Sequence, residues 1–473
     1  MKKLLSFIAA FFMVFTMNTH IYAAESQEFT ISVSQDDSRT YEVYQIFTGD
    51  YANVDGKDHL SNVQWGKNGK EKSGEVPEET LKAIEKLSGS DVEKVKELSK
   101  YVDFKSMAFK EVSSATSVKV PAGYYVLKDK TELKPGEEYS LYVFKVTKNI
   151  EVKSKSGTTS SDKKVKDAEA PNNEWNDSAD YDINDFIPFK ISAKITDKLD
   201  HYDTYKLVFH DTMSKGLTFN KDSVRAYVDG KEINQDQFVV NDTTGTADTF
   251  MITFEDIKKD PIHAHANSVI SVEYTATLND QAVIGKVGNP NTSYIEYSNN
   301  PHDVSTLGKT PEDKVKVFTY QLEITKYANE VGEGHLLKGA EFELKKVGNK
   351  SKEYKATVNE EGTKFTFKGL DAGEYILYET KTPAGYNTIK DMKITIGAKH
   401  EVTSVDPKLT ELTVTEGFTA DVNTGMIRGD IINKSGTVLP ETGGMGTTLL
   451  YLVGGAMVLG SGIVLVSRRR MNK

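Results

Sequence analysis

Apolar and polar residues alternate with a period of two along most of the chain. The alternation is clear in Phe29 to Val33, in Val224 to Val228 and in Leu322 to Thr325. Such a period is typical of strands that bury one face, so the pattern predicts an all-β protein. Asp229-Gly230 stands between two such runs and predicts a two-residue hairpin. Only Glu78 to Leu98 has apolar residues near helical spacing, which predicts a helical insertion.

Two polar stretches interrupt this alternation. Lys153 to Ala170 is rich in Ser, Lys, Thr and Asp, and Asn300 to Asp313 contains two prolines and no apolar pattern. Both compositions are typical of linkers. They predict an elongated array of three domains, each near the size of an immunoglobulin-like β-sandwich. The predicted domains are 25–155, which includes the helical insertion, 156–308 and 314–437.

Both ends of the chain carry signals for export and attachment. Lys2 and Lys3 precede an apolar run that ends at small residues, which predicts a secretory signal peptide over 1–24. Near the other end, the apolar stretch 447–466 is long enough for a transmembrane helix. The basic segment 467–473 would then hold the tail on the cytoplasmic side. We therefore expect a secreted protein that is held at the cell surface.

A five-residue motif directly precedes the apolar stretch: Leu439, Pro440, Glu441, Thr442 and Gly443. With an apolar helix and arginines behind it, this tail resembles the LPXTG cell-wall sorting signal of Gram-positive surface proteins. The resemblance implies that a sortase cleaves between Thr442 and Gly443 and attaches the protein covalently through Thr442. Pro440 suits this role because it favours an extended, accessible segment.

Composition narrows the possible functions. The chain has no cysteine, so a covalent staple would need chemistry other than a disulfide. The formal charge of -10, with no basic patch outside the linker and tail, argues against nucleic acid as a partner. No phosphate loop or Ser/His/Asp set indicates an enzyme. His263-Ala264-His265 lacks further ligands, so we expect no metal and no cofactor.

Three polar residues of the third domain occupy strand positions that the alternation assigns to the apolar, buried face. Glu379 lies within the aromatic run Tyr375 to Tyr386, Lys326 continues the apolar alternation of the first strand, and Asn433 continues that of the last. A carboxylate in a sandwich core is costly unless it is neutral or paired. The aromatic run resembles the E-box of CnaB-type pilin domains. The resemblance implies that Lys326 and Asn433 form an intramolecular isopeptide bond, promoted by Glu379.

The implied reaction needs these residue types for physical reasons. Burial lowers the pKa of a lysine, which makes its neutral amine available, and raises the pKa of a carboxyl, which can then donate a proton to the asparagine carbonyl. Attack on Cγ expels ammonia. The neutral amide removes two buried charges and ties the first strand to the last. Because each domain reacts once, the chain is not expected to be an enzyme.

The middle domain contains a similar set in another arrangement. The segments around Asp211 and Asn299 look like the acidic and asparagine strands of a CnaA-type pilin domain. The resemblance implies that Asp211 is the acid and Asn299 the amide partner. Lys163 is the preferred nucleophile because it lies in the entry strand of the domain, and Lys164 and Lys190 remain open alternatives.

The first domain is expected to lack such a bond. Apolar Val33 stands where the third domain has Lys326, so the nucleophile is missing. Ala122 to Leu127 nevertheless resembles the Gly-Tyr strand of the same sandwich family. Lys128-Asp129 follows where an E-box glutamate would be sought.

If copies of this protein are joined to one another by a sortase, an exposed lysine of one copy must attack the acyl-enzyme intermediate formed at Thr442 of another. Lys148, followed by Asn149, resembles the pilin motif, although Val146-Thr147 replaces its usual Tyr-Pro. The other candidates lie close by in the sequence: Lys145, Lys153, Lys155 or another lysine of the linker.

The resemblance to backbone pilins covers nearly the whole chain. It implies a structural subunit of a covalently polymerised pilus, in which Thr442 of one subunit is joined to Lys148 of the next. The alternative is a minor pilin or a monomeric wall-anchored adhesin. Expected partners are a sortase and identical subunits, with minor pilins and peptidoglycan as further candidates. The sequence does not identify a host ligand.

Overall fold

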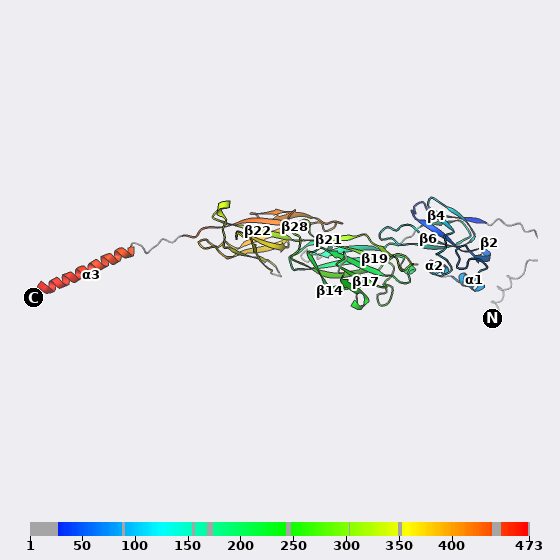
Figure 1. Cartoon of the computed structure of the whole chain (residues 1–473), viewed down its shortest axis with the longest axis horizontal. Helices are drawn as coiled ribbons and strands as arrows, with labels where there is room; N and C mark the ends of the chain where they lie inside the picture. Colours follow the sequence, from blue (N-terminus) through cyan, green and yellow to red (C-terminus); the bar gives the residue numbers. More distant parts are fainter. Residues whose placement is uncertain are drawn as a thin grey trace, which may run out of the picture. The chain divides into compact units, whose positions relative to one another are not determined.

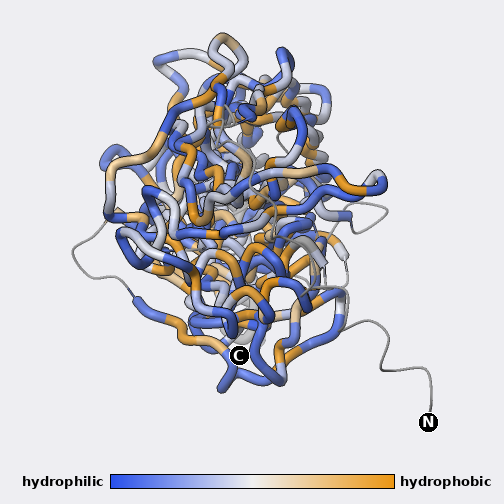
Figure 2. Tube along the Cα trace, turned by 90° about the vertical axis from the view of Figure 1, so that its right-hand side faces the viewer, coloured by the Kyte–Doolittle hydropathy of each residue, from blue (hydrophilic) through white to orange (hydrophobic). Residues whose placement is uncertain are grey.

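The computed structural model describes residues 27–87, 90–153, 157–167, 174–242, 247–301, 303–348, 352–437 and 446–471. Strands make up most of the regular structure in these residues, which confirms the all-β prediction (Figure 1). Hydrophilic and hydrophobic residues alternate at short intervals along the chain (Figure 2). The chain forms two compact units. The first contains the described residues up to Val283, Val287–Phe318 and His400–Lys408, and the second contains Ile284–Lys286, Thr319–Lys399 and the residues from Leu409 onward.

The first unit begins with a sandwich of two sheets. The smaller sheet has the strand order β5-β1-β8, and the larger has the order β3-β2-β6-β7, with β4 paired to β2. Their facing apolar side chains form one core. The strands are β1 (Glu28–Val33), β2 (Thr40–Val54), β3 (Lys57–Trp65), β4 (Lys110–Ser113), β5 (Val118–Pro121), β6 (Gly123–Asp129), β7 (Leu141–Val146) and β8 (Ile150–Val152).

Two helices cover the outer face of the larger sheet, where a helical insertion was predicted. These are α1 (Glu78–Glu85) and α2 (Asp91–Ser99), and their apolar residues pack with those of β2 in a second core (Figure 1). The helix α2 starts at Ser90, whose side chain accepts a hydrogen bond from the Glu93 backbone while the Glu93 side chain accepts one from the Ser90 backbone. This capping box starts a new helix, so the helical insertion predicted over Glu78 to Leu98 is confirmed and consists of two helices.

The second sandwich of the first unit has a single apolar core. Its sheets have the orders β10-β9-β12-β18-β14-β15 and β11-β21-β19-β13-β17-β16, with β20 paired to β19. Asp229 and Gly230 have φ values of 50° and 81° and join β14 to β15, which confirms the predicted hairpin. The strands are β9 (Ser160–Lys166), β10 (Trp175–Asn176), β11 (Ser178–Asp180), β12 (Phe186–Lys194), β13 (Leu207–Met213), β14 (Leu217–Val228), β15 (Lys231–Ile233), β16 (Val239–Asp242), β17 (Phe250–Phe254), β18 (Val269–Leu278), β19 (Asn289–Ser298), β20 (Leu307–Lys309) and β21 (Asp313–Phe318).

Both predicted linkers contain strands of this sandwich. The strand β9 lies within the stretch 153–170, and β20 and the start of β21 lie within 300–313. Each is polar in composition but pairs with an interior strand, β9 with β12 and β21 with β19. Tertiary pairing thus overrides the linker-like composition. The first unit therefore extends to Phe318, beyond the predicted boundaries at 308 and 314.

The second unit contains one more sandwich. Its sheets have the orders β25-β26-β22-β31-β30 and β24-β23-β27-β28-β29, and β22 runs parallel to β31. Residues His400–Lys408, which start at the last residue of β28, belong to the first unit. The strands are β22 (Tyr320–Ala328), β23 (Glu341–Lys346), β24 (Glu353–Lys355), β25 (Thr357–Val358), β26 (Lys364–Leu370), β27 (Gly373–Lys381), β28 (Met392–His400), β29 (Leu409–Val414), β30 (Phe418–Asp421) and β31 (Met426–Asn433).

A helix, α3 (Gly446–Met471), forms where the C-terminal helix was predicted. In the described part of the chain, no helix combines the length and the apolar character needed to cross a membrane. The helix is therefore confirmed, and the membrane span predicted for 447–466 stays a prediction. The predicted signal peptide, 1–24, lies outside the described residues.

Candidate cross-link sites

The three residues singled out in the third domain meet in its core. Lys326 on β22 and Asn433 on β31 come from neighbouring parallel strands, and Asn433 is in register with Ala328, two residues beyond Lys326. Glu379 reaches them from β27 in the opposite sheet. The side chains of Lys326 and Glu379 are fully buried, as is Asn433. Strand alternation thus predicted the face of each residue correctly.

The contacts between these three groups are direct. Lys326 Nζ donates a hydrogen bond to Asn433 Oδ1, and Asn433 Nδ2 donates one to Glu379 Oε1 at 2.8 Å. The ammonium nitrogen of Lys326 lies 3.7 Å from Glu379 Oε1. The Ile389 backbone N–H donates to the other carboxylate oxygen at 3.0 Å. The amide that would be attacked is therefore held between the nucleophile and the acid.

Burial changes the reactivity of the Lys326 amine. Loss of solvent lowers the pKa of Lys326 to about 8, although the nearby Glu379 carboxylate opposes the shift. With that pKa, roughly a tenth of the amine is neutral at pH 7. A neutral amine in contact with an amide, beside a carboxyl group and away from water, can form an amide bond.

Lys163 and Asp211 form a second buried pair, in the middle sandwich. Both side chains are fully buried, and Lys163 Nζ lies 2.5 Å from Asp211 Oδ2. Burial lowers the pKa of Lys163, opposed by Asp211, and burial raises the pKa of Asp211, opposed by Lys163. Both shifts favour the neutral forms that the reaction needs.

The two alternative lysines of the middle sandwich point away from its core. Lys164 is half-buried and pairs with Asp177 at 2.6 Å. Lys190 is half-buried and pairs with Glu273 at 3.3 Å. Of the three lysines, only Lys163 is buried, because it lies on the face of β9 that packs into the core.

The structure does not bring Asn299 to this pair; Asn291 is there instead. Asn291 is fully buried, and its Nδ2 donates a hydrogen bond at 3.2 Å to the Tyr274 hydroxyl, which also contacts Lys163 and Asp211. Asn299 follows the far end of β19, about 27 Å along the strand from Asn291. Both asparagines have the same parity, so alternation alone could not choose between them. Asn291 replaces Asn299 as the candidate.

The first domain has a non-covalent pair at the equivalent place. Asp129 ends β6 as Glu379 stands near the end of β27, six residues after a glycine in each strand. The side chain of Asp129 is fully buried and accepts a hydrogen bond from Arg39. A guanidinium stays protonated and is not a nucleophile at neutral pH. The missing lysine is therefore compensated by an ion pair.

Lys148 is exposed in the turn between β7 and β8, so its amine is accessible. Lys145 Nζ donates a hydrogen bond to the Asp58 carbonyl oxygen at 3.1 Å. Lys153 is exposed and lines a cavity of about 500 Å³. The remaining candidate and the sorting motif lie outside the described residues: Lys155, Leu439, Pro440, Glu441, Thr442 and Gly443.

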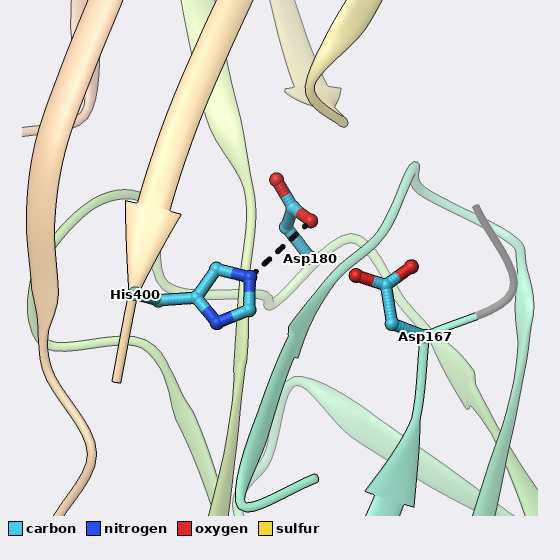
Figure 3. A group of neighbouring side chains, drawn as sticks. All are labelled: Asp167, Asp180 and His400. Atoms are coloured by element: carbon cyan, nitrogen blue, oxygen red, sulfur yellow. Dashed lines mark ion pairs between the residues drawn. The ribbon is translucent and has the colours of Figure 1, made fainter. Parts of the chain in front are cut away.

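One group of potential metal ligands was not found from the sequence, because its members come from distant segments. Asp167, Asp180 and His400, all in the first unit, place one ligand atom each within 4.8 Å of the others (Figure 3). His400 Nε2 lies 3.7 Å from Asp180 Oδ1. Its Nδ1 lies 2.7 Å from the hydroxyl of Ser178, which donates to the Glu401 carbonyl oxygen. The Asp180 carboxylate and the Ser178 hydroxyl thus lie at the two ring nitrogens of His400.

Three family models match consecutive parts of the chain. The model described as Gram-positive pilin backbone subunit 2, Cna-B-like domain, matches residues 183–301. The prealbumin-like fold domain matches 320–411, and the LPXTG cell wall anchor motif matches 431–473. The middle domain is thus similar to Cna-B-like domains, where a CnaA-type domain was expected.

Known proteins show the same similarity. The trypsin-resistant surface T6 protein of Streptococcus pyogenes serotype M6 is 28% identical over 333 residues, which cover 55% of this chain and 60% of that protein. The chain therefore matches about 60% of the length of this curated relative.

Solved structures share the fold. The T6 backbone pilin of serotype M6 Streptococcus pyogenes superposes with a TM-score of 0.54 at 18% identity, covering 87% of this chain and 98% of that one. The full-length major pilin SpaD of Corynebacterium diphtheriae gives 0.50 at 16% identity, covering 86% and 97%. The anchor motif places the protein at the cell wall of the bacterial surface. The chain therefore contains a segment that matches the Gram-positive pilin backbone model and an LPXTG anchor motif, and it is similar to backbone pilins.

Proposed function

We propose that this pilin is a pilus shaft subunit that is cross-linked twice within itself and once to each neighbour. The observation that carries the internal part is the contact of Lys326, Glu379 and Asn433 in one dry cluster. An ordinary core would not bury three such groups, because each costs free energy unless it is neutral or paired. Condensation of Lys326 with Asn433 replaces them with a neutral amide and leaves Glu379 to accept its hydrogen bond.

The second internal bond would join Lys163 to Asn291, with Asp211 as the acid. Lys163 belongs to the sheet that contains β9, and Asn291 to the sheet that contains β19. This bond would therefore tie the two sheets of the sandwich together, whereas Lys326–Asn433 ties two strands of one sheet. Both bonds would oppose unfolding by keeping distant parts of the chain together.

The bond between subunits would join Thr442 of one subunit to Lys148 of the next. A sortase would cleave after Thr442 and transfer the acyl group to Lys148. The support is the LPXTG anchor motif matched over 431–473 and the exposure of Lys148 in its turn. Identical subunits and the sortase are then the necessary partners.

The intact mass of the ectodomain tests the internal bonds. Each condensation releases one ammonia, so two bonds lower the mass by about 34 Da relative to the sequence. Peptide mapping should then join Lys163 to Asn291 and Lys326 to Asn433. A mass equal to that of the sequence, with all four side chains unmodified, would refute the internal cross-links.

A further inference from the structure

The hydroxyl of Tyr274 contacts all three candidate cross-link residues of the middle sandwich, Lys163, Asp211 and Asn291. It donates a hydrogen bond to Asp211 Oδ2 at 2.5 Å. It accepts one from Lys163 Nζ at 2.9 Å and one from Asn291 Nδ2 at 3.2 Å. One donor and two acceptor sites are the full capacity of a phenol, so all of it is used on these three residues.

Aromatic neighbours fix the position of this hydroxyl. The Tyr274 ring stacks on Phe189 with centroids 5.7 Å apart, and it meets Phe250 edge-on at 5.0 Å and Phe219 edge-on at 5.9 Å. Tyr274 stands on β18, in the same sheet as Lys163, and its hydroxyl reaches the carboxyl group of the opposite sheet. Such packing leaves the phenol little freedom to rotate away.

We propose that Tyr274 is a catalytic residue that moves a proton during formation of the Lys163–Asn291 bond. This inference rests on the proposed internal cross-links and adds a fourth residue to the middle one. Its basis is geometric: the same oxygen touches the nitrogen that attacks and the nitrogen that leaves.

The proton balance closes within these four residues. The reaction starts from a neutral Lys163 amine and a protonated Asp211. Nζ bonds to Cγ of Asn291 and gives up one proton, while the Cγ–Nδ2 bond breaks and Nδ2 gains one proton and leaves as ammonia. Tyr274 donates its hydroxyl proton to Nδ2 and recovers the proton released by Nζ, by way of Asp211 Oδ2. Asp211 and Tyr274 end in their starting states.

Tyr274 also directs the proton of Asp211 to one oxygen. Because Oδ2 accepts hydrogen bonds from Tyr274 and Lys163, the acidic proton is best placed on Oδ1. Among the described residues, Asp211 Oδ1 and Asn291 Oδ1 are both buried and both lack a hydrogen-bond partner. A proton on Asp211 Oδ1 is the donor that would polarise the Asn291 carbonyl.

The third domain is an internal comparison. There, Asn433 Nδ2 donates directly to Glu379, at 2.8 Å, without an intervening hydroxyl. Removing the Tyr274 hydroxyl should therefore slow one bond and leave the other unchanged in the same molecule.

The experiment follows both bonds in the full chain as it is made. Wild type and Tyr274→Phe are synthesised by cell-free translation, samples are quenched in acid at intervals, and the two joined peptides are quantified. We expect Tyr274→Phe to form the Lys163–Asn291 bond at least about tenfold more slowly, in keeping with general acid–base catalysis, and Lys326–Asn433 at the wild-type rate. Tyr227→Phe, on β14 of the same sandwich, controls for loss of a phenol hydroxyl.

A second measurement separates catalysis from folding. In a Lys163→Ala background, where no middle bond can form, adding Tyr274→Phe should lower the melting temperature, because two buried hydrogen bonds are lost, but should leave the middle sandwich folded at the temperature of the rate measurement. An unfolded middle sandwich at that temperature would mean that the hydroxyl acts through folding and would overturn the catalytic role. An unchanged rate in Tyr274→Phe alone would also overturn it, while the absence of both joined peptides from wild type would instead defeat the proposed internal cross-links.

Discussion

Lys326 and Asn433 lie on adjacent parallel strands of one sheet, with the lysine amine hydrogen-bonded to the asparagine carbonyl oxygen. The two residues are 107 positions apart in the chain. An amide bond between them would close a loop that contains most of the third domain. This arrangement sets the first prediction.

Glu379→Ala should prevent the third-domain bond, because the variant lacks the proposed acid, which contacts the Asn433 amide nitrogen and lies 3.7 Å from the Lys326 amine. The ectodomain should then weigh about 17 Da more than wild type, after correction for the substitution, and its third domain should melt earlier and be digested faster by protease. Glu374→Ala is the matched control: Glu374 stands on the same strand but is exposed. Equal ammonia loss in Glu379→Ala and wild type would exclude the role of Glu379.

Lys163→Ala should remove the middle bond and Lys164→Ala should not. A cross-link across a loop of this size contributes about 4 to 5 kcal/mol in the chain-entropy account, and the variant also leaves Asp211 buried without its partner. Calorimetry of the ectodomain should show a lower melting temperature for the middle sandwich in Lys163→Ala alone. If Lys164→Ala has the larger effect, the placement of the nucleophile is incorrect.

Asn291→Ala should prevent the middle bond, so this variant should not lose the roughly 17 Da of one ammonia. Asn299→Ala should lose that mass as wild type does. The reason is the contact of Asn291 with the Tyr274 hydroxyl at 3.2 Å, which places its amide beside the nucleophile. Intact-mass measurements on the two variants decide between them. A normal mass loss in Asn291→Ala would rule out this asparagine.

Lys148→Ala should abolish the ladder of heavy species in cell-wall extracts boiled in detergent, with monomer still attached to the wall. Lys148 is exposed in its turn and no fold-stabilising role is expected for its amine. Lys145→Ala is the control, because Lys145 lies three residues earlier and hydrogen-bonds to the Asp58 carbonyl oxygen. A ladder that survives Lys148→Ala would transfer the acceptor role to another lysine.

Stability of the first unit should fall as the pH rises through 7, because of Glu138. Burial raises the pKa of this carboxyl from 4.5 to about 7, and its Oε1 accepts hydrogen bonds from Tyr205 at 3.0 Å and Thr159 at 3.3 Å. Since the folded pKa is above the unfolded one, the stabilising contribution is complete below pH 4.5 and is lost as the pH passes 7.

Thermal unfolding between about pH 4 and 8 measures this effect. Glu138→Gln should flatten the dependence of the melting temperature on pH, since glutamine does not titrate. Exposed Glu132 provides the control through Glu132→Gln. An equally steep dependence in Glu138→Gln would assign the titration to another group.

The alternation of apolar and polar residues predicted correctly which face of a strand each residue lies on. It did not predict which residues of neighbouring strands lie side by side. Glu379, Lys326 and Asn433 were found because a polar residue on an apolar parity is conspicuous. Asn299 and Asn291 share one parity. Which of them lies beside Asp211 depends on the register of β19 with β13, and the sequence does not display that register.

Tyr274 left no signal at all in the sequence. A tyrosine among apolar residues of a strand is ordinary core, and its importance comes from three polar groups on other strands. The strand β9 was hidden for a related reason: Ser160–Lys166 is polar in composition, and its pairing with β12 makes it a strand.

The parallel pairing of β22 and β31 decides how tension would travel through the third domain. A pull that enters at Tyr320 would run along β22 to Lys326, cross the amide to Asn433 and leave the domain there. The hydrogen bonds of the other strands would bear none of this load, so the polypeptide between the two anchor points could not be drawn out. Extension of the domain would stop after a few residues, however weak its remaining contacts.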